Sequence, residues 1–161
     1  MQHEPRILEL HQDLAALGYK PFFIPLGVKR DEQDILHSAC IKCDTCDGYP
    51  CLLHAKSDAD INCVRPALAN HNVTLLTEAM ASKLITTADG KAIDYVEVLH
   101  QGEIINFKAD IVIAACGAIN SAILMLKSAN DKHPRGLANS SDQVGRNFMK
   151  HINTAVLSIS T

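Results

Sequence analysis

The chain has 161 residues, which is enough for one ordinary domain with a hydrophobic core. Hydrophobic residues make up 47% of it, charged residues 20%, and the net charge is −3. This balance is typical of a soluble globular protein and excludes a strongly basic, nucleic-acid-binding surface. No apolar run approaches the roughly 20 residues that cross a bilayer. Residues 1–13 lack a secretory signal, so the cytoplasm is the default location unless an earlier part of the polypeptide is missing.

Two helices are predicted in the first half of the chain. Pro5 suits a first helical turn, and residues 7–17 carry apolar side chains at helical spacing. A second helix is predicted from Ser57, because Ser57 and Asp60 have the spacing of a capping box. Pro66 falls inside this second pattern and should kink or divide the helix.

Three strands are predicted next, over residues 79–87, 92–99 and 103–108. Asp89-Gly90 and Gln101-Gly102 lie between them and are typical of hairpin turns. The pattern therefore predicts an antiparallel β-meander.

A strand–turn–helix unit is predicted over residues 110–128. Residues 110–115 form a continuous apolar run, as expected of a strand buried on both faces of a parallel sheet. Cys116-Gly117 ends the run, and apolar residues at helical spacing follow. This order indicates an α/β fold of the doubly wound type. Residues 129–147 are predicted to be a surface loop, and residues 154–160 a β-like stretch.

The turn at the end of residues 110–115 is a candidate ligand site. Gly117 and Ala118 are small enough for a ligand to approach the backbone, and the helix that follows offers free N–H groups to an anion. The alternative is that these small residues only allow the strand and helix to pack closely. The chain contains no GxGxxG loop, so we expect it to lack a pyrophosphate-binding loop of its own.

Four of the six cysteines fall within residues 40–51 as C-x2-C-x2-C-x4-C, namely Cys40, Cys43, Cys46 and Cys51. The spacing is close to a ferredoxin cluster motif but differs from it in the last gap. Zinc is a second possibility, although structural zinc sites usually pair two separated knuckles. Disulfides or unmodified thiols are favoured over a metal.

The remaining polar candidates give weaker signals. Ser121 does not lie in a GxSxG elbow, and a polar contact at the helix N-terminus is expected of it. No pair among the eight histidines has the spacing of a metal site.

Several segments in order resemble the glucose–methanol–choline (GMC) oxidoreductases. Residues 110–130 resemble the family's second signature, Gly-Ala-x-x-Ser-Pro-x-Leu-Leu-x-x-Ser-Gly, although alanine replaces its proline and its glycine. The fitting residues are Gly117, Ala118, Ser121, Leu124 and Ser128. Residues 143–151 resemble the family's Val-Gly-x-x-Leu-x-x-His segment, and residues 43–68 resemble the cysteine-bearing region of some bacterial members.

Residues 72–98 resemble the family stretch that precedes this signature. In the family, a valine there contacts the adenine of the flavin through its backbone, and Ala81 takes that place here. The resemblance therefore implies FAD as cofactor. The implied cofactor-binding residues are Ala81, Cys116, Gly117, Ala118 and Ser121.

The resemblance also implies a domain plan. Residues 1–152 would form the middle and C-terminal part of an incomplete Rossmann-like FAD-binding domain, with a Cys-rich loop at 40–51, a β-meander at 79–108 and a strand–helix unit at 110–128. Residues 153–161 would begin a substrate-binding domain. No residue is assigned a catalytic role, because His151 does not match the position of the family's base.

The function implied by the resemblance is FAD-dependent oxidation of a CH–OH group in an alcohol, sugar or choline-like small molecule, by hydride transfer to flavin. The electron acceptor is not implied, and the chain by itself is expected to be an inactive internal fragment. Two alternatives stay open. One is an electron-transfer module with a metal or iron–sulfur cluster at Cys40–Cys51. The other is a non-catalytic, truncated α/β domain.

Overall fold

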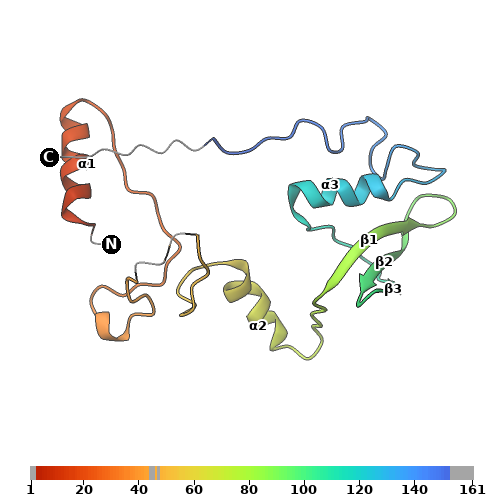
Figure 1. Ribbon diagram of the computed structural model, residues 1–161, viewed down its shortest axis with the longest axis horizontal. Helices are drawn as coiled ribbons and strands as arrows, with labels where there is room; N and C mark the ends of the chain where they lie inside the picture. Colours follow the sequence, from red (N-terminus) through yellow and green to blue (C-terminus); the bar gives the residue numbers. More distant parts are fainter. Residues whose placement is uncertain (1–2, 44–45, 47, 153–161) are drawn as a thin grey trace. The chain divides into compact units, whose positions relative to one another are not determined.

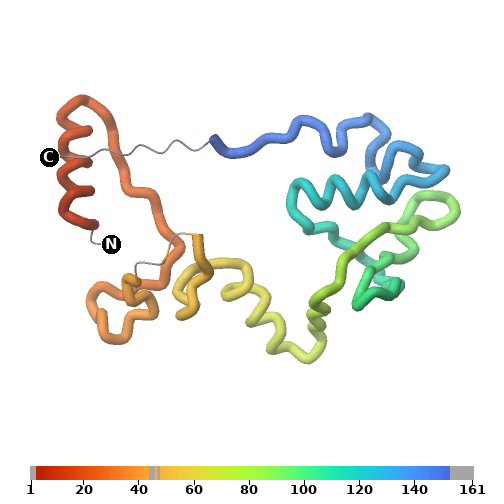
Figure 2. Tube along the Cα trace, in the orientation of Figure 1, coloured from red at the N-terminus to blue at the C-terminus, as the bar shows by residue number. Residues whose placement is uncertain are grey.

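The computed structural model describes residues 3–43, 46 and 48–152. The chain divides into two compact units, Met1–Leu75 and Leu76–Thr161, which we call the N-terminal and C-terminal units. Figure 1 shows the helices and strands, and Figure 2 the path of the chain. The predicted substrate-domain segment, residues 153–161, lies outside the described residues.

Helix α1, Pro5–Ala16, opens the N-terminal unit, and its prediction is confirmed (Figure 1). Pro5 occupies the first turn, where its missing N–H leaves no hydrogen bond unmade. The ring of Phe23 stacks on His11 of the helix, with ring centroids 4.9 Å apart, and on His3 at 3.7 Å. These stacks hold the extended stretch after α1 against the helix.

The second predicted helix begins slightly later than expected and is divided. A π-helical turn, η2 (Asp60–Val64), leads into α2, Arg65–Leu68. The predicted capping box of Ser57 and Asp60 is not formed, because Ala59 is the N-cap residue and no side chain caps the turn. Asp58 Oδ1, one residue earlier, accepts a hydrogen bond from the Ile61 N–H at 2.9 Å. The wide turn directly precedes Pro66, whose ring nitrogen has no hydrogen to donate, so the predicted division is confirmed. A shorter 3₁₀ turn, η1, spans Ile35–His37.

The C-terminal unit is built on the predicted meander. Strands β1 (Ala79–Thr86), β2 (Ile93–His100) and β3 (Glu103–Phe107) form an antiparallel sheet in the order β1-β2-β3. Each strand lies within one residue of its predicted boundaries at both ends. Gly90 and Gly102 have positive φ in the two turns, a backbone conformation that glycine adopts without steric strain.

Helix α3, Gly117–Lys127, packs against β1 and forms the core of this unit. Leu124 of the helix meets Leu84 of β1 and Leu137 of the following loop, and all three are buried. Ile93 and Val96 of β2 border this cluster. The core is small, so each of its members should contribute strongly to the stability of the unit.

The structure differs from the prediction at residues 110–115, where no strand is formed. Ile111 and Ile113 are 78% and 82% exposed, although a buried strand was expected. A strand needs a neighbour for its N–H and C=O groups. Within the described residues, the sheet contains only the three antiparallel strands, so the predicted parallel pairing is absent from this part of the chain.

The segment after α3 has no regular structure, as predicted, but parts of it are buried. Leu137 and Asn139 are almost inaccessible. The Asn139 side chain donates to the Arg135 carbonyl at 2.7 Å and accepts from the Val144 N–H at 2.9 Å. The loop is therefore packed through its own polar groups and not merely laid over the surface.

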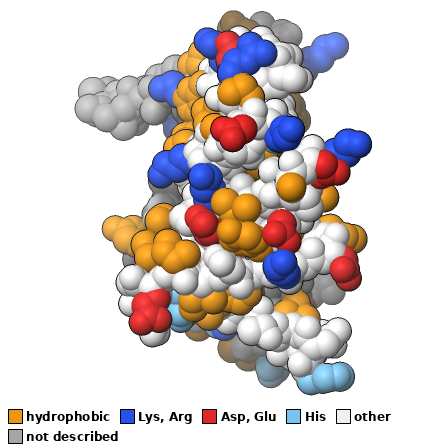
Figure 3. Space-filling model, turned by 90° about the vertical axis from the view of Figure 1, so that its right-hand side faces the viewer, with side chains coloured by type: hydrophobic (Ala, Val, Ile, Leu, Met, Phe, Trp, Pro, Cys, Tyr) orange, Lys and Arg blue, Asp and Glu red, His pale blue; other side chains and the backbone are white. Residues whose placement is uncertain are grey.

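Large apolar side chains remain accessible in both units. Figure 3 shows several of them as separate hydrophobic patches between charged side chains on one face. No described helix has the length and apolar character needed to cross a membrane.

Candidate functional site

The beginning of α3 presents accessible backbone. Cys116 is the N-cap residue, and Cys116, Gly117 and Ala118 are all exposed. Gly117 has a φ of +77°, and a Cβ built on it would meet no atom within 4 Å. The turn therefore combines a glycine conformation with open space in front of it, which permits a ligand to approach the main chain.

Ser121 closes this turn from inside the helix. Its Oγ accepts a hydrogen bond from the Cys116 N–H at 3.1 Å, which confirms the predicted polar contact at the helix N-terminus. No side chain of the described residues caps α3 at Cys116. The N–H groups of the first helical turn thus lack a side-chain acceptor at the cap, an arrangement that suits an anionic group.

Ala81 lies at a break in the register of β1. It is exposed and faces Val98 of β2, and the pairing shifts between Ala81 and Lys83. The extra residue, Ser82, donates its hydroxyl to the Glu97 carbonyl at 3.1 Å. A bulge of this kind increases the local twist and redirects the strand. The sequence pattern gave no signal of the bulge.

The two candidate segments belong to neighbouring elements. Helix α3 contacts β1, and the Leu84 N–H of β1 bonds to Ser128 just after the end of α3. Figure 1 shows the beginning of β1 and the beginning of α3 toward the same side of the C-terminal unit. Ala81 and the Gly117 turn therefore both lie away from the hydrogen bond between Leu84 and Ser128.

The cysteine-rich loop has its own polar organisation. The Cys51 Sγ accepts a hydrogen bond from the Ala55 N–H at 3.4 Å. The Lys56 ammonium donates to the carbonyl oxygens of Cys46 and Tyr49, the latter at 2.7 Å. Among the residues that the structure describes, no three His, Cys, Asp or Glu side chains gather into a group able to hold a metal ion.

This arrangement predicts a selectively reactive thiol at Cys51. The Ala55 N–H is the main cause that lowers the pKa of the Cys51 thiol, with help from the Lys56 ammonium and against partial burial. A lower pKa means more thiolate at a given pH, so alkylation of Cys51 in the folded protein should reach half of its maximal rate at a lower pH than alkylation of the same cysteine in the denatured protein. Site-resolved mass spectrometry after timed labelling across a pH series measures both rates. Coincident pH profiles would contradict this prediction.

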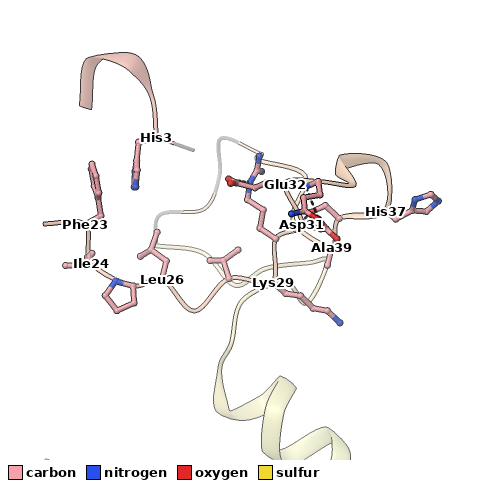
Figure 4. Close-up of a pocket in the computed structure, with 14 residues that line it drawn as sticks. His3, Phe23, Ile24, Leu26, Lys29, Asp31, Glu32, His37 and Ala39 are labelled. Atoms are coloured by element: carbon pink, nitrogen blue, oxygen red, sulfur yellow. Dashed lines mark hydrogen bonds and ion pairs between the residues drawn. The ribbon is translucent and has the colours of Figure 1, made fainter. Parts of the chain in front are cut away.

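The N-terminal unit contains a separate open hollow of about 1000 Å³. Figure 4 shows its lining, with His3 and Phe23 stacked at one end and the charged residues Lys29, Asp31 and Glu32 further along. None of the predicted cofactor-binding residues lines it. The sequence pattern indicated only an extended, proline-containing stretch there.

Similarity to known proteins agrees with the motifs of the C-terminal unit and extends to most of the chain. Residues 24–153 match the GMC oxidoreductase family. The chain is 33% identical over 133 residues to 6'''-hydroxyparomomycin C oxidase of Streptomyces lividus. The aligned region covers 81% of this chain and 24% of that protein. It is 34% identical over 139 residues to paromamine 6'-oxidase of Streptomyces fradiae, covering 85% of this chain and 25% of that protein.

A third relative is 5-(hydroxymethyl)furfural oxidase of a Methylovorus species, 36% identical over 106 residues, or 62% of this chain and 18% of that protein. The chain thus spans about a quarter of the length of the two Streptomyces oxidases. The family match covers far more than half of the chain and includes both the β1 segment and the beginning of α3. This chain belongs to the GMC oxidoreductase family.

Proposed function

We propose that the polypeptide containing this chain is an FAD-dependent oxidoreductase that oxidises a CH–OH group of a small molecule. Within it, this chain supplies backbone contacts to FAD. The contacting residues are Ala81, Cys116, Gly117, Ala118 and Ser121. The observation that carries the proposal is the family match over residues 24–153, which contains all five residues.

The chemistry of the five residues fits such a cofactor. Ala81, Cys116 and Ala118 are exposed and carry small side chains, and exposed Gly117 leaves open space in front of the main chain. The uncapped first turn of α3 favours a group with negative charge. The residues would therefore bind and orient FAD without contributing an acid or a base.

The chemistry that FAD would supply when bound is acceptance of a hydride from the CH–OH carbon. The role of this chain is to hold the cofactor in place for that step. None of its described residues is assigned the removal of the hydroxyl proton. His151 is exposed one residue before the end of the described range and has no role in the proposed reaction.

The substrate class is proposed from the names of the relatives. Two of the relatives are oxidases named for hydroxyl-bearing compounds, namely 6'''-hydroxyparomomycin C and 5-(hydroxymethyl)furfural. We therefore propose a hydroxyl-bearing small molecule, with sugar-like alcohols as the first compounds to test.

The test is to purify the polypeptide that contains this chain and to identify its flavin after release. Addition of a sugar-like alcohol without oxygen should bleach the flavin, whereas the matching deoxy compound should not. The 161-residue chain alone should retain no FAD. A colourless polypeptide that binds no added FAD would refute the proposal, and stoichiometric iron or zinc in its place would favour the metal-module alternative.

A further inference from the structure

Ser128 joins the end of α3 to β1 through a wholly buried hydroxyl. Its relative exposure is 0%. The hydroxyl donates to the Leu124 carbonyl at 2.6 Å and accepts the Leu84 N–H at 2.8 Å. One side chain thus satisfies a carbonyl of the helix and an N–H of the strand at the same point.

Two further contacts continue this junction along the chain. The Asn130 side chain donates to the Thr86 hydroxyl at 3.2 Å. The His133 Nε2 bonds to the Gly90 carbonyl, in the turn between β1 and β2, at 2.8 Å. Ser128, Asn130 and His133 thus contact successive positions along β1 and the turn that follows it. We call these three contacts, made by Ser128, Asn130 and His133, the α3–β1 seam.

The Leu84 N–H explains why a hydroxyl is needed at the buried end of the seam. It points to Ser128, 44 residues away, and β1 has β2 as its single neighbour in the described sheet. A buried N–H without an acceptor is unfavourable, so a hydrocarbon side chain at position 128 would leave this group unsatisfied. The strand and helix would then lose a buried hydrogen bond that joins them.

Ser128 lies at the C-terminal end of α3, and the Gly117 turn lies at its N-terminal end. The 11 residues of α3 rise about 1.5 Å each, so the Gly117 turn is roughly 16 Å from Ser128. Ala81 lies about 10 Å along β1 from Leu84. A rotation of α3 by about 10° at the seam would therefore move the Gly117 turn by about 3 Å. Hydrogen bonds tolerate much less displacement than this.

We propose that Ser128 is a positioning residue for the cofactor site. Its buried hydroxyl fixes α3 against β1 and thereby sets the separation between Ala81 and the Gly117 turn. This inference rests on the proposed function, because it takes these two places as the backbone contacts to FAD. Ser128 itself touches no cofactor and acts only through the orientation of the two elements.

The test compares Ser128→Ala with Leu137→Ala in the polypeptide that contains this chain. Ser128 bonds to the backbone of Leu84 and Leu124, and Leu137 packs against the same two residues, but only the first change removes the hydroxyl of the seam. Ser128→Ala should raise the FAD dissociation constant at least about tenfold, while kcat at saturating FAD stays within about twofold. Leu137→Ala should lower the melting temperature with less than about a twofold change in FAD affinity.

An FAD affinity of Ser128→Ala equal to that of the unchanged protein, or to that of Leu137→Ala, would overturn the inference. If Ser128→Ala does not fold, Asn130→Ala decides the question. It removes a half-buried seam contact and should raise the FAD dissociation constant about threefold, whereas no change would count against the seam. An unchanged protein that binds no flavin would instead refute the proposed function.

Discussion

Replacing Leu124 by alanine is expected to lower the free energy of unfolding of the C-terminal unit by about 2–5 kcal/mol. Leu124 is buried between Leu84 and Leu137, and the rest of the core is too small to fill the cavity left behind. Such a loss approaches the total stability of many small domains. Denaturant titration followed by circular dichroism measures it.

Ile123→Ala is the matched control for this prediction. Ile123 lies beside Leu124 on α3 but is exposed, so its truncation should cost less than about 1 kcal/mol. Equal losses for the two variants would mean that Leu124 is not part of a packed core.

Gly136→Ala should destabilise the same unit by about 3 kcal/mol or more. Gly136 has a φ of +102°, and a Cβ there would lie 2.9 Å from the Leu126 Cα and 3.0 Å from the Met125 carbonyl oxygen. Both neighbours are backbone atoms of α3 and cannot rotate away. The loop would have to move off the helix, and the bond from the Leu137 N–H to the Met125 carbonyl would be lost with it.

Gly102→Ala separates the two causes of this loss. Gly102 also has a positive φ, +86°, but a Cβ on it would meet nothing within 4 Å. We expect a cost of about 1–2 kcal/mol, from backbone strain alone. Thermal unfolding of the two variants gives the comparison, and a Gly136 variant no less stable than the Gly102 variant would argue against the close approach of loop and helix.

Local patterns were sufficient to predict most elements of the C-terminal unit. Asp89-Gly90 and Gln101-Gly102 separate the three strands, and their preference for tight turns depends only on neighbouring residues. Helix α3 follows from apolar spacing of the same short range. The strand expected at residues 110–115 depends on a distant partner, and the described residues provide none. An apolar run alone does not determine where a partner strand comes from.

The contacts between residues far apart in the sequence could not be predicted from local sequence patterns. Nothing in the sequence around Ser128 shows that its hydroxyl reaches Leu84, 44 residues earlier. The burial of Asn139 within a polar loop was not predicted either, because Asn-rich segments usually lie at the surface. At the candidate site, the turn at Cys116-Gly117 was predicted from the order of apolar run, small residues and helical pattern. The place of Ala81 came only from the family resemblance.

We propose that this chain contacts FAD through the backbone at two places, near Ala81 and at the beginning of α3. Amide hydrogen exchange of the containing polypeptide, with and without FAD, tests it most directly. We predict that FAD slows exchange in residues 79–83 and 116–121 and leaves β3, Glu103–Phe107, unchanged. Bound FAD with unchanged exchange in both of the first two segments would contradict the account.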